Sequence, residues 1–434
     1  MKTMTRTLRL APIAALCAAA LPALATNGYF PHGYGMKAQG MGGTSIALAQ
    51  DSMGGATNPA AMVWAGSRLD LGVNWFSPQR DAERSGAAFA PINGQVESGE
   101  TSFFIPEFGY NRMVSPELAL GLTVYGNGGM NTTYPQGSFQ CPTSPTTVAP
   151  ANMLCGSGTL GQDLMQLIVA PTVAYKLNAQ HAVGAALLLG YQRFKAEGLQ
   201  AFQGLSSAPG SVTNNGYDSS TGVGIRLGYQ GHLSDMVSIG AAYAPKMHMG
   251  KFDNYKGLFA GQGSFDIPAH FSVGIAVMPT PQWTLAADFG RIEYSGVPSV
   301  GNPSSNQAPL GADNGPGFGW KSINVFKIGA SWRASENWTL RAGFNRGDNP
   351  ITSANVSFNI IAPGVMTTHW TAGFTAALDK TNEITGAFMV APRQTVTGPS
   401  MFNSPALFPP GGMGGNETIG MKEMSFGLAW GHKF

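Results

Sequence analysis

Charged side chains are scarce in this chain. Lysine, arginine, aspartate and glutamate make up only 11% of its 434 residues, whereas soluble domains carry roughly 25%. A soluble protein normally has more charge on its surface than this. The composition therefore argues against a water-soluble fold.

Long apolar runs are also missing. After residue 25 the sequence has no stretch of about 20 apolar residues, which excludes transmembrane helices. Glycine is abundant instead, with 59 residues, about twice its usual share. Low charge without apolar runs is typical of transmembrane strands, in which lipid-facing side chains alternate with small or polar ones.

The first 25 residues have the features of a secretory signal peptide. They combine a basic start, an apolar stretch and a small-x-small cleavage site, at Lys2, Arg6 and Arg9, at 10–20 and at 23–25. The mature chain would begin at Thr26. Its net charge would be +2 − 3 = −1, because the excised piece has three positive residues and no negative ones. A near-neutral charge gives no reason to expect nucleic-acid binding.

Cysteine is rare, with three residues in the whole chain. Cys17 lies in the expected signal peptide, and the bulky Leu16 before it fits a lipoprotein cleavage site poorly. Cys141 and Cys155 lie in a stretch rich in proline, serine and threonine. We expect these two to form a loop disulfide in an oxidising compartment. Two cysteines with no nearby histidine do not make a zinc site, so no metal is expected.

Apolar residues recur with a period of two from residue 67 to the end, which predicts strands with one apolar face. The last strand is the clearest, and its apolar face carries Met424, Phe426, Leu428, Trp430 and Phe434. A closed barrel needs such a strand to pair with its first. The final phenylalanine also resembles the signal that the bacterial outer-membrane assembly machinery recognises, so we expect that machinery to be a partner.

The connections between these segments alternate in length. Six short ones are predicted at 113–117, 178–180, 234–236, 280–282, 335–337 and 380–382, and seven long ones at 81–100, 126–162, 198–220, 251–264, 295–320, 348–366 and 400–417. Thirteen connections give fourteen strands, with short turns in the periplasm and long loops outside. Trp283 and Trp338 each follow a short turn, where an aromatic girdle is expected. We predict an all-β, antiparallel transmembrane barrel over residues 67–434.

A barrel of fourteen strands leaves a lumen that must be obstructed. Residues 26–66 are glycine-rich and have no strand alternation, but they are too apolar for a disordered leader. We expect them to form a plug, the hatch, inside the lumen. Within it, 45–50 is predicted to form one helical turn, and Asn58-Pro59 marks a turn or helix start before the first strand.

Four motifs, in order, resemble one family. They are the hatch sequence from Gly33 to Ala60, the run from Tyr125 to Tyr134, the loop from Lys251 to Phe259 followed by 265–268, and the C-terminal strand. Together they resemble the FadL/TodX-type long-chain fatty-acid and hydrocarbon transporters of the Gram-negative outer membrane. The loop with Cys141 and Cys155 is the part that resembles the family least.

The resemblance implies a monomeric, hatched barrel that carries fatty acids or hydrocarbons without an energy source. Outer loops would catch the substrate, an internal apolar pocket would hold it, and an opening beside a kink in the third strand would release it sideways. The matching kink residues are Gly126, Gly128 and Gly129. The hatch and gating positions are Thr26, Asn27, Gly28, Tyr29, Phe30, Asn58, Pro59 and Ala60, with the N-terminus near the pocket.

Other residues are candidates because of their side-chain chemistry. Tyr255, Leu258 and Phe259 are apolar groups on a glycine-flanked loop, so we expect them to be exposed and to capture substrate. Strand parity turns several charges inward, at Asp70, Glu107, Arg226, Asp288, Lys327, Arg333, Arg341 and Arg393, together with His270 and His369. The default role of such a charge is to pair with a hatch carboxylate. Alternatively, Lys327, Arg341 or Arg226 binds the carboxylate of a fatty acid.

The sequence thus favours passive uptake of hydrophobic molecules, most simply long-chain fatty acids, across an outer membrane of lipid and lipopolysaccharide. A hydrocarbon or aromatic-compound channel of the same fold is the alternative. A general aqueous porin and a barrel-anchored surface-binding protein remain less favoured readings. Neither a Gly-x-Ser-x-Gly elbow nor a phosphate-binding glycine loop occurs. We therefore expect no enzymatic activity and no cofactor.

Overall fold

The computed structural model describes residues 27–144, 147–405 and 414–434. The expected signal peptide and Thr26 lie outside the described residues. Across the described ranges, none of the helices combines the length and the apolar character needed to span a bilayer.

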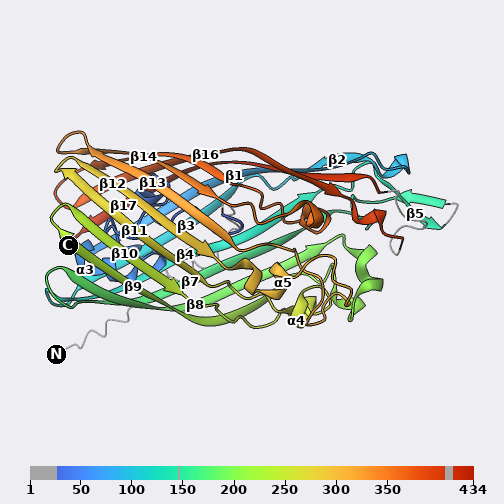
Figure 1. The fold of residues 1–434 in the computed structure, drawn as a ribbon, viewed down its shortest axis with the longest axis horizontal. Coiled ribbons are helices and arrows are strands. Elements are labelled where there is room, and N and C mark those ends of the chain that lie inside the picture. The colour runs from blue at the N-terminus through green and yellow to red at the C-terminus, as the bar shows by residue number, and fades with distance from the viewer. Residues whose placement is uncertain (1–26, 145–146, 406–413) are drawn as a thin grey trace, which may run out of the picture.

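Fourteen strands form one closed antiparallel sheet, as the sequence predicted (Figure 1). Neighbours in the chain are neighbours in the sheet, and β17 pairs with β1 to close the barrel. The barrel strands are β1 (Arg68–Ser85), β3 (Phe103–Met113), β4 (Leu118–Tyr134), β7 (Leu160–Lys176), β8 (His181–Glu197), β9 (Asp218–Ser234), β10 (Val237–Ala244), β11 (His270–Thr280), β12 (Trp283–Ile292), β13 (Ile323–Arg333), β14 (Trp338–Gly347), β15 (Thr368–Ala377), β16 (Asn382–Pro399) and β17 (Asn416–Lys433).

The C-terminal strand closes the barrel along its whole length. Its register runs from Arg68↔Lys433 to Ser85↔Asn416. Met424, Phe426 and Leu428 are exposed on the outside, while Glu423 and Ser425 are buried inside. The backbone of this strand therefore has partners on both sides, which lipid requires.

The outer surface is apolar and the inside is polar, as the alternation predicted. Exposed leucine, isoleucine, valine and aromatic side chains occur at every second position of the wall. At the short-turn end, Trp283 and Trp338 are both exposed, and the ring of Trp283 stacks on that of Trp332 at 5.8 Å. These residues are placed as an aromatic girdle.

All six short turns and seven long loops occur as predicted, but two loops are shorter than expected. Residues 81–85 belong to β1, and 126–134 belong to β4. Both segments lie beyond the clearly alternating part of their strands. Outside the lipid, hydrogen bonds to the neighbouring strand still continue, but the apolar face is no longer needed. The sequence pattern therefore ends before the strand does.

The long loops contain short elements of their own, which fold over the long-loop end of the barrel (Figure 1). They are η3 (Ala90–Ile92), β2 (Gly94–Glu97), β5 (Gln140–Ser144), β6 (Thr147–Pro150), η4 (Gln200–Leu205), η5 (Pro209–Ser211), η6 (Asp253–Tyr255), α4 (Ala260–Gly263), η7 (Tyr294–Gly296), α5 (Pro298–Gly301), η8 (Ser353–Asn355), η9 (Ser357–Ile360) and η10 (Met401–Asn403). Strand β2 pairs only with the outer end of β1.

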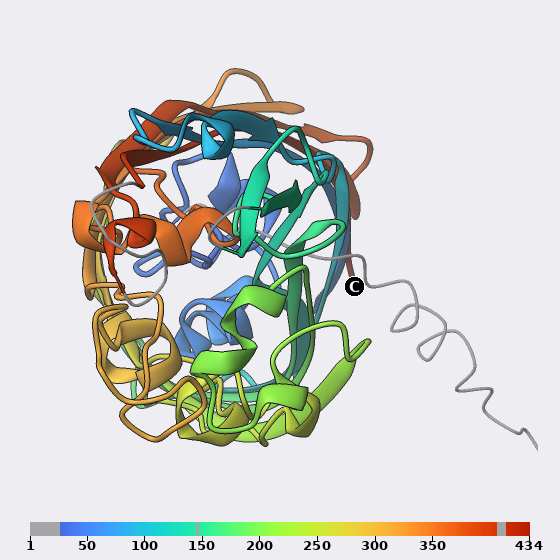
Figure 2. The same cartoon turned by 90° about the vertical axis from the view of Figure 1, so that its right-hand side faces the viewer.

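The hatch lies inside the lumen, where Figure 2 shows it in blue within the ring of strands. It contains α2 (Met36–Gln39), η1 (Gly54–Ala56), η2 (Pro59–Ala61) and α3 (Met62–Ala65). Asn58 caps η2 by accepting a hydrogen bond from the Ala60 N–H, with Pro59 in the first turn, as predicted. Of the helical turn predicted at 45–50, one hydrogen-bonded turn is present, in which the Leu48 N–H donates to the Ser45 carbonyl oxygen (3.2 Å), but these residues form no helix. Asp288 of the wall accepts from the N–H groups of Ser45 and Ile46.

One inward charge is also predicted wrongly. Arg393 lies on the outer face, where its guanidinium pairs with Asp81 beside Gly420. The cause is a register shift between Ala391 and Gln394 in the pairing of β16 with β17. A bulge of this kind moves every later side chain to the opposite face. Strand parity alone does not reveal it.

Candidate substrate route

The barrel wall has a gap between β3 and β4. The two strands pair from Met113↔Ala119 to Phe108↔Val124. Beyond that point β3 continues along β1 to Phe103, and β4 continues along β7 to Tyr134, but no pairing joins them within the described residues. The two strands thus separate towards the long-loop end, which leaves one backbone edge of β4 without a strand partner.

The predicted kink glycines lie at the start of this edge. The register of β4 against β7 shifts between Gly126 and Gly128, so a bulge bends β4 where it leaves β3. Gly129 follows directly. The structure therefore brings all three glycines to the wall gap.

The N-terminal segment, Asn27–Tyr34, lies against this free edge. The Gly129 N–H donates to the carbonyl oxygen of Tyr29 (3.3 Å), and the Tyr34 hydroxyl donates to the carbonyl oxygen of Asn127 (3.2 Å). A Cβ on Gly128 would lie 2.2 Å from the Tyr29 carbonyl oxygen. Glycine at position 128 is what allows the segment to come so close.

Farther out, the loop between β2 and β3 covers the same edge. The Gly99 N–H donates to the Thr133 carbonyl oxygen (2.8 Å), and the Thr133 N–H donates to the Ser98 hydroxyl (3.0 Å). Arg80 of β1 donates to the carbonyl oxygens of Asn131 and Glu100. The hatch therefore covers the inner part of the edge, and a loop covers the outer part.

Tyr294, in η7, holds the N-terminal segment in place. Its hydroxyl donates to the Asn27 carbonyl oxygen (2.5 Å) and accepts from the N–H groups of Tyr29 (3.1 Å) and Phe30 (3.3 Å). Burial raises the pKa of Tyr294, so the hydroxyl stays protonated and can donate. The Tyr29 ring packs at 5.1 Å from Tyr294 and 6.0 Å from Trp320. Tyr294 is one tyrosine in an irregular loop, and no pattern in the sequence pointed to its role.

Behind the segment lies a cavity, the inner cavity. Phe30 and Tyr34 of the hatch line it, together with Arg226, His270 and Lys327 of the wall. The Phe30 and His270 rings meet edge to face at 5.2 Å. The cavity thus combines aromatic surface with two cationic side chains.

The two cations differ in how they are engaged. Arg226 Nη1 donates to the Gly55 carbonyl oxygen (2.7 Å) and to the Tyr125 hydroxyl (3.2 Å), and its Nη2 lies 2.9 Å from His270 Nε2. Lys327 Nζ has one longer hydrogen bond, to the Gly43 carbonyl oxygen (3.4 Å). Lys327 is therefore the freer of the two to meet a ligand. Arg341, the third predicted residue, lines a different cavity at the short-turn end.

A second cavity, the outer cavity, lies among the long loops and is lined mainly by apolar side chains. Leu258 and Phe259 line it with Phe202 and Phe358, whose rings are 6.3 Å apart. Phe259 is buried rather than exposed, and Leu258 is half-buried. These two predicted capture residues therefore face an internal space instead of the solvent.

Tyr255 is not an exposed capture residue, contrary to the prediction. It is fully buried, donates to the Gly216 carbonyl oxygen (2.6 Å) and accepts from the Ala196 N–H (3.1 Å). Its ring packs against Phe194 at 4.8 Å. Its hydroxyl joins the loop to β8. A sequence pattern does not distinguish a buried tyrosine with such a role from an exposed one.

Carboxylates of the wall bind the hatch, whereas the sequence analysis expected wall charges to pair with carboxylates of the hatch. Asp70 accepts from Ser52 N–H (2.9 Å), Glu107 accepts from Gly35 N–H (3.1 Å), and Asp288 accepts from Ser45 N–H (2.8 Å). Lys37 pairs with Glu383 at 2.6 Å. The described hatch has a single carboxylate, Asp51, which accepts from the N–H of Met53. The wall therefore supplies the acceptors.

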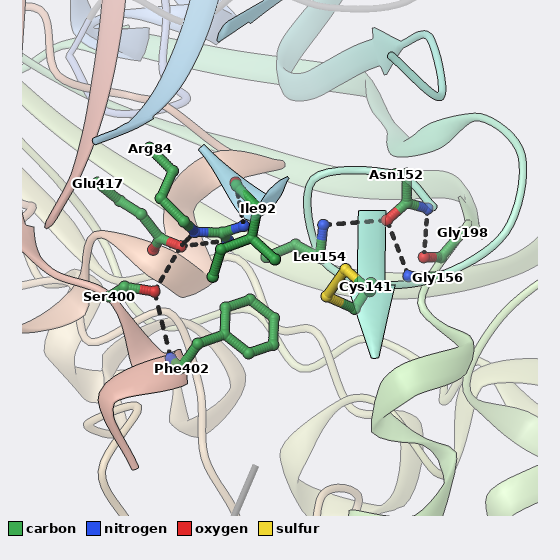
Figure 3. The surroundings of a disulfide bond; sticks show 11 residues. Arg84, Ile92, Cys141, Asn152, Leu154, Gly156, Gly198, Ser400, Phe402 and Glu417 are labelled. Atoms are coloured by element: carbon green, nitrogen blue, oxygen red, sulfur yellow. Dashed lines mark hydrogen bonds and ion pairs between the residues drawn. A yellow bond between two sulfur atoms is a disulfide. The ribbon is translucent and has the colours of Figure 1, made fainter. Parts of the chain in front are cut away.

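The disulfide lies at the long-loop end (Figure 3). Cys141 and Cys155 are bonded, with their Cα atoms 5.5 Å apart. Beside them, Asn152 accepts from the N–H groups of Leu154 and Gly156 and donates to the Gly198 carbonyl oxygen. The bonded loop is thereby tied to the end of β8, which makes its role structural.

Comparisons with known proteins agree with this architecture. The family described as "Outer membrane protein transport protein (OMPP1/FadL/TodX)" matches residues 32–398. No curated protein matches the chain by sequence.

Three solved structures show the same fold at low identity. The Pseudomonas putida toluene transporter TodX has a TM-score of 0.66 at 18% identity and covers 93% of this chain and 99% of its own. A Pseudomonas aeruginosa FadL homologue has a TM-score of 0.69 at 15% identity, with 94% and 100% covered. The Ralstonia pickettii toluene transporter TbuX has a TM-score of 0.61 at 19% identity, with 93% and 99% covered.

Proposed function

Because this chain belongs to the outer-membrane transport family OMPP1/FadL/TodX, we propose that it moves hydrophobic small molecules passively through its wall. The chain is an outer-membrane β-barrel, and its family consists of transport proteins rather than enzymes. The observation that carries the proposal is the separation of β4 from β3, together with the N-terminal segment, which contacts β4 at this gap and also lines the inner cavity.

The route has three parts. Substrate enters the outer cavity among the loops, passes to the inner cavity, and leaves through the wall gap once the N-terminal segment moves. Apolar burial supplies the affinity at about 25 cal/mol per Å². A sideways exit suits such a solute, because it passes from protein directly into hydrocarbon and never re-enters water.

We propose monoaromatic or similar hydrocarbons as the preferred substrates. TodX and TbuX, which share the fold, are toluene transporters. The outer and inner cavities are both lined by aromatic rings. Tyr29 and Phe30 lie between the inner cavity and the gap. A small flat ring needs less displacement of these side chains than a long acyl chain does.

Long-chain fatty acids are the second candidate, because Lys327 and Arg226 line the inner cavity. A carboxylate there would accept a charge-assisted hydrogen bond from Lys327 Nζ. Replacing Lys327 by methionine separates the candidates. Oleate binding falls in this variant if the carboxylate meets Lys327, whereas toluene uptake is retained.

A disulfide across the gap tests the route itself. A Cβ on Gly126 would lie 3.3 Å from Ile105 Cγ2, so the pair Ile105→Cys and Gly126→Cys can bridge β3 and β4. The matched control is Leu285→Cys with Ala330→Cys, which lie opposite each other on β12 and β13.

We expect uptake of labelled toluene to be lost in the oxidised gap variant and restored by reductant, while the control keeps its uptake in both states. Wild type receives the same reductant, because its native disulfide is also reduced. Uptake that continues through the oxidised gap variant would refute the lateral route.

We further propose that the chain acts as a monomer and that the assembly machinery reads the strand ending at Phe434. Phe434 is exposed at the end of β17, and its N–H donates to the Ser67 carbonyl oxygen. Its exposed ring supports such recognition. Deleting Phe434 should therefore lower the amount of barrel in the outer membrane.

A further inference from the structure

A third cavity, the periplasmic basin, lies at the short-turn end. It shares no lining residue with the inner cavity. One side is the hatch segment 47–50, and the other is the wall from β9 to β14. The transport route described above does not use it.

Two arginines of the wall lie side by side in this basin. Arg333 is opposite Thr339, and Arg341 is opposite Ser331, so the arginines are diagonal neighbours on the inner face of β13 and β14. Diagonal pairs of this kind have Cβ atoms about 7 Å apart. No aspartate or glutamate is among the described residues that line the basin. Lys37 of the hatch is a third cation in the lining, but it pairs with Glu383 at 2.6 Å. Arg333 and Arg341 therefore share the basin with no carboxylate in its described lining, although Glu383 and Asp51 lie near enough to act on Arg341.

The polar groups of the basin are incompletely paired. Arg341 Nη1 donates to the Thr375 hydroxyl (2.7 Å), but its Nε is buried and has no partner among the described residues. The same holds for His232 Nε2. A buried polar group left unpaired costs about 1–3 kcal/mol. Because Arg341 Nε is enclosed, an acceptor in the basin would meet the guanidinium through its terminal nitrogens.

Apolar side chains line the basin beside polar ones such as Gln50, Gln230 and Gln282. Leu48 of the hatch, Trp64 at its end and Met278 of β11 all face the basin. Trp64 also packs edge to face on His232, with ring centroids 4.5 Å apart. A free inorganic anion would make no use of these surfaces, whereas an anion with a hydrophobic part would.

We propose that the periplasmic basin binds an organic anion, with its carboxylate at Arg341 and Arg333 and its apolar part against Leu48, Trp64 and Met278. Because hatch residues form one side, occupancy would be sensitive to the position of the hatch. The site goes beyond the proposed transport route, and its test needs no transport.

The test measures benzoate binding to the full chain in lipid nanodiscs by calorimetry. We expect Arg341→Gln to weaken benzoate binding about tenfold, because a charge-assisted hydrogen bond is lost. Arg333→Gln changes an exposed side chain, so it should leave folding intact and still weaken binding. Arg346→Gln is the matched control, since Arg346 is exposed on the same strand and donates to Thr368.

Two further ligands test which chemical class of ligand the basin binds. Benzyl alcohol, which lacks the charge, should bind about tenfold more weakly than benzoate. Inorganic phosphate should compete poorly. The proposal is overturned if wild type does not bind benzoate, if neither arginine variant weakens it, or if the alcohol or phosphate binds as well as benzoate. A failed lateral route would appear only in the toluene assay with the bridged gap, so the two failures are distinguishable.

Discussion

Gly128 is the residue at which the wall and the N-terminal segment come into close contact. A side chain there would collide with the Tyr29 carbonyl oxygen, which accepts a hydrogen bond from the Gly129 N–H. Glycine at position 126 is different, because an added Cβ would meet only the γ2 methyl group of Ile105, at 3.3 Å, and no backbone atom. These two neighbouring glycines therefore differ in what they tolerate.

We predict that Gly128→Ala displaces the N-terminal segment at a cost of about 1–3 kcal/mol, while Gly126→Ala is accommodated. Hydrogen exchange of the Tyr29 and Phe30 amides measures the difference. Exchange should accelerate in the first variant only. Equal exchange in both would show that position 128 is not where the segment is held.

His32 makes the docking of the hatch depend on pH. Its pKa is lowered to about 4, first because burial disfavours the imidazolium and second because Lys327 repels it. An undocked hatch would titrate near 6.5. The neutral docked form is thus fully favoured above about pH 6.5, and this contribution is lost as the pH falls towards 4.

We predict faster exchange of hatch amides at pH 5 than at pH 7, after correction for intrinsic rates. The His32 contribution amounts to at most about 1.4 kcal/mol per pH unit. His32→Gln is the comparison, because it keeps a polar group and removes the titration. If both proteins respond equally to pH, other groups such as Asp51 or Lys37 account for the effect.

The hatch and the barrel strands are joined by contacts that can be fixed chemically. Thr44 lies against β13, where a Cβ on Gly329 would be 2.7 Å from its Oγ1. Cysteines at 44 and 329 should therefore form a bridge between hatch and wall. The same Cβ would lie 2.5 Å from the Met41 carbonyl oxygen, so Gly329→Cys shifts this part of the hatch, and the single variant measures that effect. The barrel strands should stay paired, since the Thr44 side chain donates within the hatch, to Met41.

We predict that this hatch bridge abolishes toluene uptake in the oxidised state and that reduction restores it. The single variants Thr44→Cys and Gly329→Cys serve as controls for the substitutions themselves. Full uptake by the bridged protein would mean that this part of the hatch stays in place during transport. The gap between β3 and β4 would then open through the N-terminal segment alone.

At the scale of the whole molecule, the plugged lumen separates this barrel from a porin. Hatch side chains from Asn27 to Val63 are almost all buried. Asp70 and Asp288 of the wall accept from hatch N–H groups, and Glu383 pairs with Lys37. A dissolved sugar has no wide aqueous path past these contacts. The aqueous porin considered from the sequence is therefore disfavoured by the packing.

Liposome swelling provides the corresponding measurement. We predict that liposomes containing this protein swell in arabinose little faster than empty ones, whereas a porin incorporated at the same density gives rapid swelling. Rapid swelling by the wild-type protein would contradict the plugged lumen. A variant with the hatch bridge is a useful control, because its lumen cannot be cleared.

The sequence predicted the barrel, the strand number and the hatch. Lipid imposes a period of two on every wall strand, as in β17, and this rule can be read without knowing the neighbours. The number of strands then follows from the number of short turns, such as 280–282, and long loops, such as 348–366. The rule fails where lipid no longer acts, which is why the ends of β1 and β4 and the bulge at Arg393 were missed.

Only the tertiary structure decided how the candidate residues are grouped. Lys327 and Arg341 have the same parity, yet Lys327 faces the inner cavity and Arg341 the periplasmic basin, because depth depends on strand register. Tyr294 binds the N-terminal segment more than 260 residues away in the chain. The gap itself is a missing set of backbone hydrogen bonds between β3 and β4, and backbone pairing across strands leaves no trace in side-chain periodicity.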